Sequence, residues 1–230
     1  MKRIFLSAIV MFSLQVFAIP AWQDPQVNQK QREPARADYF AFESVEKAEK
    51  GDIESSERYL SLNGPWQFLW RNSIADCSSL NGFFNVGFDD SDWNELYLPC
   101  CQELAGYGFP LYRNIGYAWM NQYENQPPLV PEDNNHAGFY RRHFLLPEQW
   151  KGQEVFLNIG SATSNVQVWI NGKEAGYSED SKTEAHFNIT KYLKPGDNLI
   201  ALKVMRWCDG TYVEDQDFWR LSGITRDIYL

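Results

Sequence analysis

Short apolar runs with the period of a β-strand dominate this chain from about residue 60 onward. Trp66, Phe68 and Trp70 alternate with other residues, as expected for a strand with one buried face. Further short runs recur along the chain, at 138–144, 155–159 and 166–170. Asn171-Gly172 predicts a hairpin turn after the last of these. No long amphipathic helix pattern intervenes, so the sequence predicts an all-β fold, an antiparallel β-sandwich.

The first eighteen residues have a different pattern. Lys2 and Arg3 precede an apolar run from Ile4 to Ala18. The run is too short to span a membrane comfortably, and residues suited to cleavage stand at its end. Residues 1–18 are therefore predicted to be a secretory signal peptide, which implies export to the periplasm or the extracellular space. No second apolar segment follows, so no membrane association is expected after cleavage.

Residues 19–57 are polar and show no clear strand pattern. They are predicted to be an irregular N-terminal arm, with a disordered linker as the alternative. The character of the chain changes at Tyr59, and residues 58–230 are predicted to form one domain with a sizeable core.

Charge narrows the class of partner. The 21 basic and 30 acidic residues give a net charge of −9, and loss of Lys2 and Arg3 leaves 19 against 30, or −11. An acidic surface argues against nucleic acid or an anionic membrane as a partner. Aromatic residues make up 16% of the chain and include nine tryptophans, a content that suits a carbohydrate-binding protein.

The cysteines raise the question of disulfides in an exported chain. Their spacing does not match a zinc site, and the three histidines also lack metal-ligand spacing. Adjacent Cys100 and Cys101 rarely bridge each other, because the geometry is strained. One of them could pair with Cys77 or Cys208, and the sequence does not decide which.

Acids and tryptophans are concentrated between Arg206 and Asp227. Asp209-Gly210 predicts a turn, and the segment 213–219 is predicted to be extended beyond it. Asp215, Asp217 and Trp219 would then share one face. Carboxylates that accept hydroxyls beside indole rings are one chemical style of sugar binding. The alternative is a surface ion-pair network with the neighbouring arginines.

The stretch R-W-C-D-G-T-Y-V-E-D-Q-D-F-W-R-L-S-G-I-T-R-D resembles the signature that ends the first domain of β-galactosidases of glycoside hydrolase family 2. In that family the last acid of E-D-Q-D lies at the galactose site and helps to hold a sodium ion. The matching residue here is Asp217. The resemblance thus implies that Asp217 binds substrate and sodium.

Other segments resemble the same family. L-N-G-P-W-Q-F matches the opening of its first domain, and F-D-D-S-D-W matches a polar turn closed by a packed indole. In G-Y-G-F-P-L-Y-R-N, Asn114 falls on the asparagine that hydrogen-bonds sugar hydroxyls, a role that suits an amide because it donates and accepts. Upstream, Cys100-Cys101-Gln102 replaces the usual Ser-Asn-Trp, a change that bears on packing behind the site.

The resemblance covers 27–230 and implies a jelly-roll sandwich with an N-terminal arm that helps subunits to associate. It also implies that the catalytic glutamates of this retaining enzyme lie in a TIM barrel, after an immunoglobulin-like domain, and that this chain lacks both. Leu230 falls within the expected last strand, which indicates a truncated chain. Asp215 and Asp217 have a spacing open to a catalytic pair, but the family assigns this cluster to binding.

The sequence therefore predicts the sugar-binding domain of a secreted β-galactosidase, inactive by itself. Its expected partners are β-galactosides, the missing C-terminal domains and further copies of the chain. Sodium is a candidate cation, and magnesium is a candidate cofactor of the full-length enzyme. The alternatives are an independent carbohydrate-binding module and a structural or assembly domain.

Overall fold

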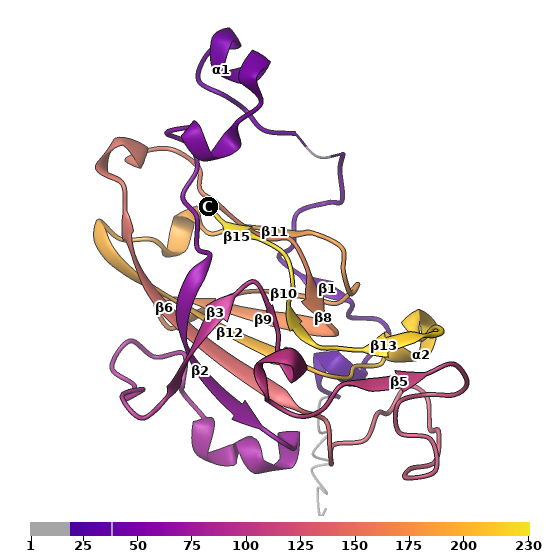
Figure 1. Ribbon diagram of the computed structural model, residues 1–230. Coiled ribbons are helices and arrows are strands. Elements are labelled where there is room, and N and C mark those ends of the chain that lie inside the picture. The colour runs from indigo at the N-terminus through magenta and orange to yellow at the C-terminus, as the bar shows by residue number, and fades with distance from the viewer. Residues whose placement is uncertain (1–18, 38) are drawn as a thin grey trace, which may run out of the picture.

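The computed structural model describes residues 19–37 and 39–230. The predicted signal peptide, 1–18, lies outside the described residues. Within them, no helix combines the length and the apolar character needed to cross a membrane. The described chain forms a β-sandwich in which one large antiparallel sheet faces smaller sheets, with the arm running along the outside (Figure 1).

Strands make up most of the regular structure. They are β1 (Gln29–Lys30), β2 (Gly64–Arg71), β3 (Asn94–Leu98), β4 (Cys100–Cys101), β5 (Leu111–Arg113), β6 (Ala137–Leu146), β7 (Phe156–Ile159), β8 (Ala162–Thr163), β9 (Asn165–Ile170), β10 (Lys173–Ser178), β11 (Ala185–Asn188), β12 (Gly196–Met205), β13 (Phe218–Arg220), β14 (Gly223–Ile224) and β15 (Ile228–Tyr229). The helices are short: α1 (Val45–Lys50), α2 (Thr211–Glu214) and the 3₁₀ turns η1 (Ala21–Gln23), η2 (Ile53–Ser55), η3 (Ile74–Leu80), η4 (Glu103–Ala105), η5 (Glu148–Trp150) and η6 (Thr190–Tyr192).

The large sheet has the order β1-β10-β9-β12-β6-β2-β3, and all of its pairings are antiparallel. The smaller sheets are β11-β7-β15, β4-β14-β8 and the two-stranded β13-β5. β9 and β10 are joined by Asn171-Gly172, both with positive φ, as the hairpin prediction requires. The predicted all-β antiparallel sandwich is confirmed.

The main core lies between the large sheet and the smaller ones. Side chains of β12 such as Ile200 and Leu202 meet Ile159 of β7 and Ile228 of β15 there, all of them buried. Trp66 and Phe68 of β2 belong to the same cluster, and Trp70 packs against it partly buried. The prediction that these three aromatic residues are core is therefore confirmed.

A second cluster covers the opposite face of the large sheet. Residues 74–93 fold over this face and insert Phe83 against Phe139 and Trp169. Trp93 packs on Phe88, so the predicted polar turn is closed by an indole. Arg141 of β6 holds this segment against the sheet through an ion pair, in which its Nε lies 2.6 Å from Asp90 Oδ2. Both faces of the central strands are thus buried.

The arm runs along its own domain. β1 pairs with the edge strand β10, and Arg32 forms a bridge with Phe187. Arg32 Nη1 also donates to Ser178 Oγ at 3.1 Å. The pairing extends the large sheet by one strand and covers part of its edge. Subunit association through this arm stays a prediction.

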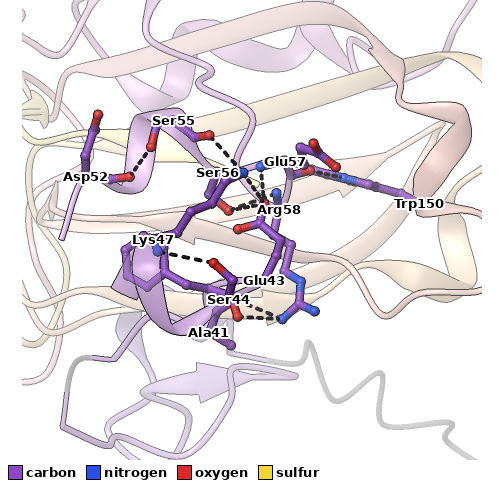
Figure 2. A network of polar contacts seen from close by, with 11 residues as sticks. Ala41, Glu43, Ser44, Lys47, Asp52, Ser55, Ser56, Glu57, Arg58 and Trp150 are labelled. Atoms are coloured by element: carbon purple, nitrogen blue, oxygen red, sulfur yellow. Dashed lines mark hydrogen bonds and ion pairs between the residues drawn. The ribbon is translucent and has the colours of Figure 1, made fainter. Parts of the chain in front are cut away.

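The last part of the arm is a compact knob, residues 41–58, held by one carboxylate (Figure 2). Glu43 accepts from Ser56 Oγ at 3.0 Å, from Lys47 Nζ at 3.4 Å and from the N–H of Glu57. Arg58 donates to the carbonyl of Ala41 at 2.9 Å. Trp150 Nε1 donates to the carbonyl of Glu57 at 2.7 Å, which attaches the knob to the sandwich.

All four cysteines are free thiols. Cys77 lies in the segment over one face of the large sheet, whereas Cys100 and Cys101 lie in β4. Cys208 is buried near the carbonyl of Ser164. The disulfides that the sequence left open do not form, because the fold places these thiols in separate parts of the domain.

Gly176 gives a direct test of the core packing. A Cβ at this position of β10 would overlap the ring of Phe187, which is fully buried. Gly176→Ala should therefore lower the unfolding free energy by about 1–3 kcal/mol. Gly87→Ala is the control, because Gly87 has no atom within 4 Å of its ideal Cβ position and no positive φ. Urea unfolding measures both, and equal stability of the two variants would contradict the packing described.

Candidate functional site

A two-stranded ribbon, β5 and β13, carries the residues that the sequence singled out. Tyr112 lies opposite Trp219, and Arg113 lies opposite Phe218. Exposure alternates along the ribbon as it must in a strand. Leu111, Arg113, Phe218 and Arg220 are partly or fully buried, whereas Tyr112 and Trp219 are exposed. The ribbon therefore has one inner and one outer face.

Asn114 and Asp217 belong to the outer face. Asn114 directly follows β5, and Asp217 directly precedes β13. The two positions therefore lie one step beyond the Arg113–Phe218 pair. Both residues are exposed. The Tyr112 hydroxyl donates to Asp217 Oδ1 at 2.7 Å, which shows that the two side chains point to the same side. The structure thus brings together the two predicted site residues, about a hundred positions apart in sequence.

The acidic segment differs from the predicted extended strand over 213–219. Residues 211–214 form the helical turn α2, and only 218–220 pair as a strand. The turn at Asp209-Gly210 is as predicted, with the N–H of Thr211 donating to the carbonyl of Cys208 at 3.0 Å. Tyr212 then packs against Trp119 in a small aromatic cluster. This packing favours helical backbone over the extended chain that residue type alone suggested.

The two acids Asp215 and Asp217 consequently do not share a face. Asp215 points inward and forms an ion pair with Arg220, with side chains only 6% and 8% exposed. Burial raises the pKa of Asp215, and the neighbouring guanidinium opposes that rise. The alternative of a surface ion-pair network is wrong for this pair, which is buried. Asp217 instead remains in contact with solvent.

Behind the ribbon lies a cavity of about 330 Å³. Phe218 and Arg220 of the inner face line it, together with Arg206 and Lys182. Its walls combine Lys182, Arg206 and Arg220 with Asp180, Glu214 and Asp215, so the formal charges cancel. The cavity therefore has no charge preference for an anion or a cation.

A buried carboxylate, Glu103, joins the segment before β5 to the segment after β13. Glu103 accepts from the N–H of Ser222 at 2.8 Å and from its hydroxyl at 2.7 Å. Glu103 precedes the loop that leads to β5, and Ser222 follows β13. Cys100-Cys101-Gln102, the departure noted in the sequence, lies in this region: β4 pairs with β14, and Gln102 Nε2 donates to the Tyr140 hydroxyl at 2.7 Å.

The structure contains a second acidic cluster that the sequence did not predict. Glu179, Cys208 and Asp209 are all buried, and their polar atoms lie within 4.8 Å of one another. Burial raises the pKa of Glu179 to about 8, and the charge of Asp209 adds to the rise. The Tyr177 hydroxyl donates to Glu179. The sequence predicted a turn at Asp209, but no local pattern indicates that Glu179, thirty residues earlier, contacts it.

The oxygens near Asp217 suit a hard cation. The carboxylate of Asp217 and the amide carbonyl of Asn114 are both oxygen donors, the ligands that hard cations prefer. Oδ1 of Asp217 already accepts from Tyr112. Within 19–37 and 39–230, the metal-like grouping is Glu179, Cys208 and Asp209. Asp217 is not in that grouping, so a sodium ion at this carboxylate stays a prediction.

The inner and outer acids should respond differently to mutation. Asp215→Ala leaves the guanidinium of Arg220 buried and unpaired, so it should destabilise the domain by about 3–5 kcal/mol. Asp217→Asn changes an exposed group and should shift stability by only about 0.5 kcal/mol. Chemical denaturation of the two variants checks this difference. A stable Asp215→Ala variant would show that the ion pair is not buried in solution.

The acid cluster predicts a pH dependence of stability. The pKa of Glu179 is about 8 in the folded state and 4.5 as an ordinary carboxyl, so the folded state holds a proton that the unfolded chain releases. The contribution of Glu179 to the free energy of unfolding is therefore most favourable below pH 4.5. It declines as the pH rises from 4.5 through the folded-state pKa of about 8. We expect a loss on the order of 1–3 kcal/mol between about pH 5 and 9.

The matched variant is Glu179→Gln, which keeps the shape of the side chain and removes the titration. Its melting temperature should fall less than that of the parent chain over the same pH range. Parallel pH profiles of the two proteins would show that Glu179 titrates normally.

Comparison with known proteins places this domain in a family. Residues 59–230 match the model of the family "Glycosyl hydrolases family 2, sugar binding domain". The chain is 42% identical over 212 residues to a β-galactosidase of Priestia megaterium, covering 92% of this chain and 20% of that protein. It is 38% identical over 208 residues to a β-galactosidase of Halalkalibacterium halodurans, covering 90% and 20%.

Solved structures agree on the fold. A β-glucuronidase of Bacteroides uniformis superposes with a TM-score of 0.55 at 25% identity, over 74% of this chain and 17% of that one. This chain spans about a fifth of the length of the curated relatives that it matches. With the match over 59–230, these similarities show that the chain belongs to the sugar-binding domain family of the family 2 glycosyl hydrolases.

Proposed function

We propose that this domain supplies part of the galactose-binding site of a β-galactosidase. The observation that carries the proposal is the outer face of the β5–β13 ribbon, where Asn114 and Asp217 lie together and exposed. The two curated relatives described above are both β-galactosidases, which supports galactose over other sugars.

The chemistry of the two side chains suits sugar hydroxyls. The Asn114 amide can donate and accept at once, and the Asp217 carboxylate accepts strong hydrogen bonds. With Oδ1 engaged by Tyr112, Asp217 keeps its other oxygen for a ligand. A sodium ion at this carboxylate would supply positive charge to a sugar oxygen while partly neutralising the acid.

We assign hydrolysis to residues outside this chain. A retaining glycosidase needs two carboxyl groups about 5 Å apart beside the bond that is cleaved. Asp215 is engaged with Arg220 on the inner side, and Asp217 faces outward, so these two acids are unsuited to act as that pair. The domain therefore binds substrate and leaves bond cleavage to the remainder of a full-length enzyme. Export, subunit association through the arm, and magnesium in that enzyme stay predictions.

The test uses this chain and galactose, with binding followed by NMR titration with and without sodium. Asp217→Asn should weaken binding by roughly 1.5–3 kcal/mol and blunt the sodium dependence, because it removes a charged acceptor. Asn114→Ala should cost less, on the order of 1 kcal/mol. The control is Asp197→Asn, which alters an aspartate of β12 whose side chain is 51% exposed and lies 2.8 Å from Nδ1 of His143 on β6.

Two outcomes would contradict the proposal. The first is galactose affinity and sodium response unchanged in Asp217→Asn. The second is turnover of a chromogenic β-galactoside by this chain that disappears in Asp217→Asn, because the acid would then act in bond cleavage.

A further inference from the structure

The loop between β10 and β11 touches the ribbon from its inner side. Nζ of Lys182 lies 3.9 Å from the centroid of the Phe218 ring. One residue earlier, the N–H of Ser181 donates to Oε1 of Glu214 in α2 at 3.0 Å. This loop therefore contacts the chain on both sides of Asp217, at Glu214 before it and at Phe218 directly after it.

The backbone of this loop is unusual at Lys182. Its φ is +67°, in the left-handed region that side chains other than glycine rarely adopt. Asp180 has a φ of +76°, but aspartate tolerates this region through local bonds, and its Oδ1 accepts from Thr183 Oγ1 at 3.1 Å. A lysine side chain offers no acceptor for such a bond. Contacts with the rest of the domain must therefore hold Lys182, and backbone outliers of this kind gather where position matters for function.

Contacts on two sides hold the loop. Arg226 Nη1 donates to the carbonyl of Lys182 at 2.8 Å, which fixes its backbone to the sandwich. Arg32 of the N-terminal arm reaches both ends of the loop. Its Nη2 lies 3.5 Å from Asp180 Oδ2 and donates to the carbonyl of Glu184 at 3.4 Å. The loop is therefore fixed on the side away from the ribbon, and the Lys182 ammonium extends from it to the ribbon.

We propose that Lys182 is a positioning residue for Asp217, which it holds through Phe218 at the inner face of β13. The inference rests on the proposed function, because it takes Asp217 as the acid that binds the sugar. It gives the loop between β10 and β11, and the arm that holds this loop, a part in setting the candidate site.

Phe218 can transmit position because of its place in the strand. It directly follows Asp217, and successive side chains of an extended chain point to opposite faces. A cation near an aromatic ring is attracted by the negative face of the ring, and the attraction grows where water is partly excluded. Phe218 is partly buried and lines the cavity behind the ribbon together with Lys182. Fixing this ring on the inside therefore limits the directions that Asp217 can take on the outside.

The second cation beside Phe218 cannot perform the same task. The guanidinium carbon of Arg220 lies 4.3 Å from the centroid of the ring. Arg220 belongs to the same strand, β13, and pairs with Asp215 of the same segment. A movement of this segment would carry Arg220 with it. Of the two cations, Lys182 is the one that ties Phe218 to a different part of the chain.

The hydrogen bond from Tyr112 to Asp217 gives a readout that needs no ligand. The ¹³Cζ NMR signal of Tyr112 responds to the bond that its hydroxyl makes, and Tyr112→Phe assigns the signal. Lys182→Ala should shift it toward its position in Asp217→Asn, whereas Lys182→Arg keeps a cation and should leave it in place. Lys173→Ala, at an exposed lysine of β10, is the matched control and should not shift it.

Galactose affinity of the same chain is the second readout. Lys182→Ala should weaken binding about two- to fivefold, the range that one cation–π contact supports, and Lys182→Arg should restore it. Gly176→Ala, which is expected to lower stability in the core, should leave the Tyr112 signal and the affinity unchanged. A general loss of stability would therefore not reproduce the effect of Lys182→Ala.

The outcomes separate this inference from the proposed function. An unshifted Tyr112 signal in Lys182→Ala overturns the positioning role, even where Asp217→Asn weakens galactose binding and the proposed function stands. An equal shift in Lys182→Arg also overturns it, because the cation would not be the cause. So does a shifted signal with unchanged galactose affinity. If Lys182→Ala shifts the signal and the parent chain does not bind galactose, Lys182 positions Asp217 and the proposed function is the part that fails.

Discussion

The antiparallel pairing of β5 with β13 is the constraint on which the candidate site depends. These strands come from loops a hundred residues apart, and only their register brings Asn114 beside Asp217. The ribbon is itself short, so its position relies on attachments from its inner face. The buried Asp215–Arg220 ion pair and the bonds from Ser222 to Glu103 supply them. A change at these inner contacts would move the outer face without touching a site residue.

Environment separates two acids that stand two residues apart in one short motif. Asp215 is drawn into the domain because Arg220 offers a partner, and a buried carboxylate without a partner would be costly. Asp217 accepts a neutral hydroxyl from Tyr112 and keeps its contact with solvent. The first therefore stabilises the loop, and the second remains accessible from solvent.

The relatives share one fold although their names give different substrates. The β-glucuronidase of Bacteroides uniformis shares the architecture at 25% identity, whereas the β-galactosidases of Priestia megaterium and Halalkalibacterium halodurans share 42% and 38%. A common sandwich can serve different glycosidases, because substrate preference depends on a few side chains at the loops. In this domain the candidate side chains for such a preference, Asn114 and Asp217, lie on one exposed ribbon.

The sequence by itself determined the class of fold and the strands of the core, and its resemblance to a family named Asn114 and Asp217 as candidate site residues. Alternation at Trp66, Phe68 and Trp70 and the Asn171-Gly172 turn are local signals, and local backbone preferences carry them. Tertiary structure alone decided that 211–214 is helical, that Asp215 is buried while Asp217 is not, and that four cysteines stay unpaired. It also brought Glu179 to Asp209 and Tyr112 to Trp219. These facts depend on contacts between distant segments, and the energy of such contacts is absent from any local pattern.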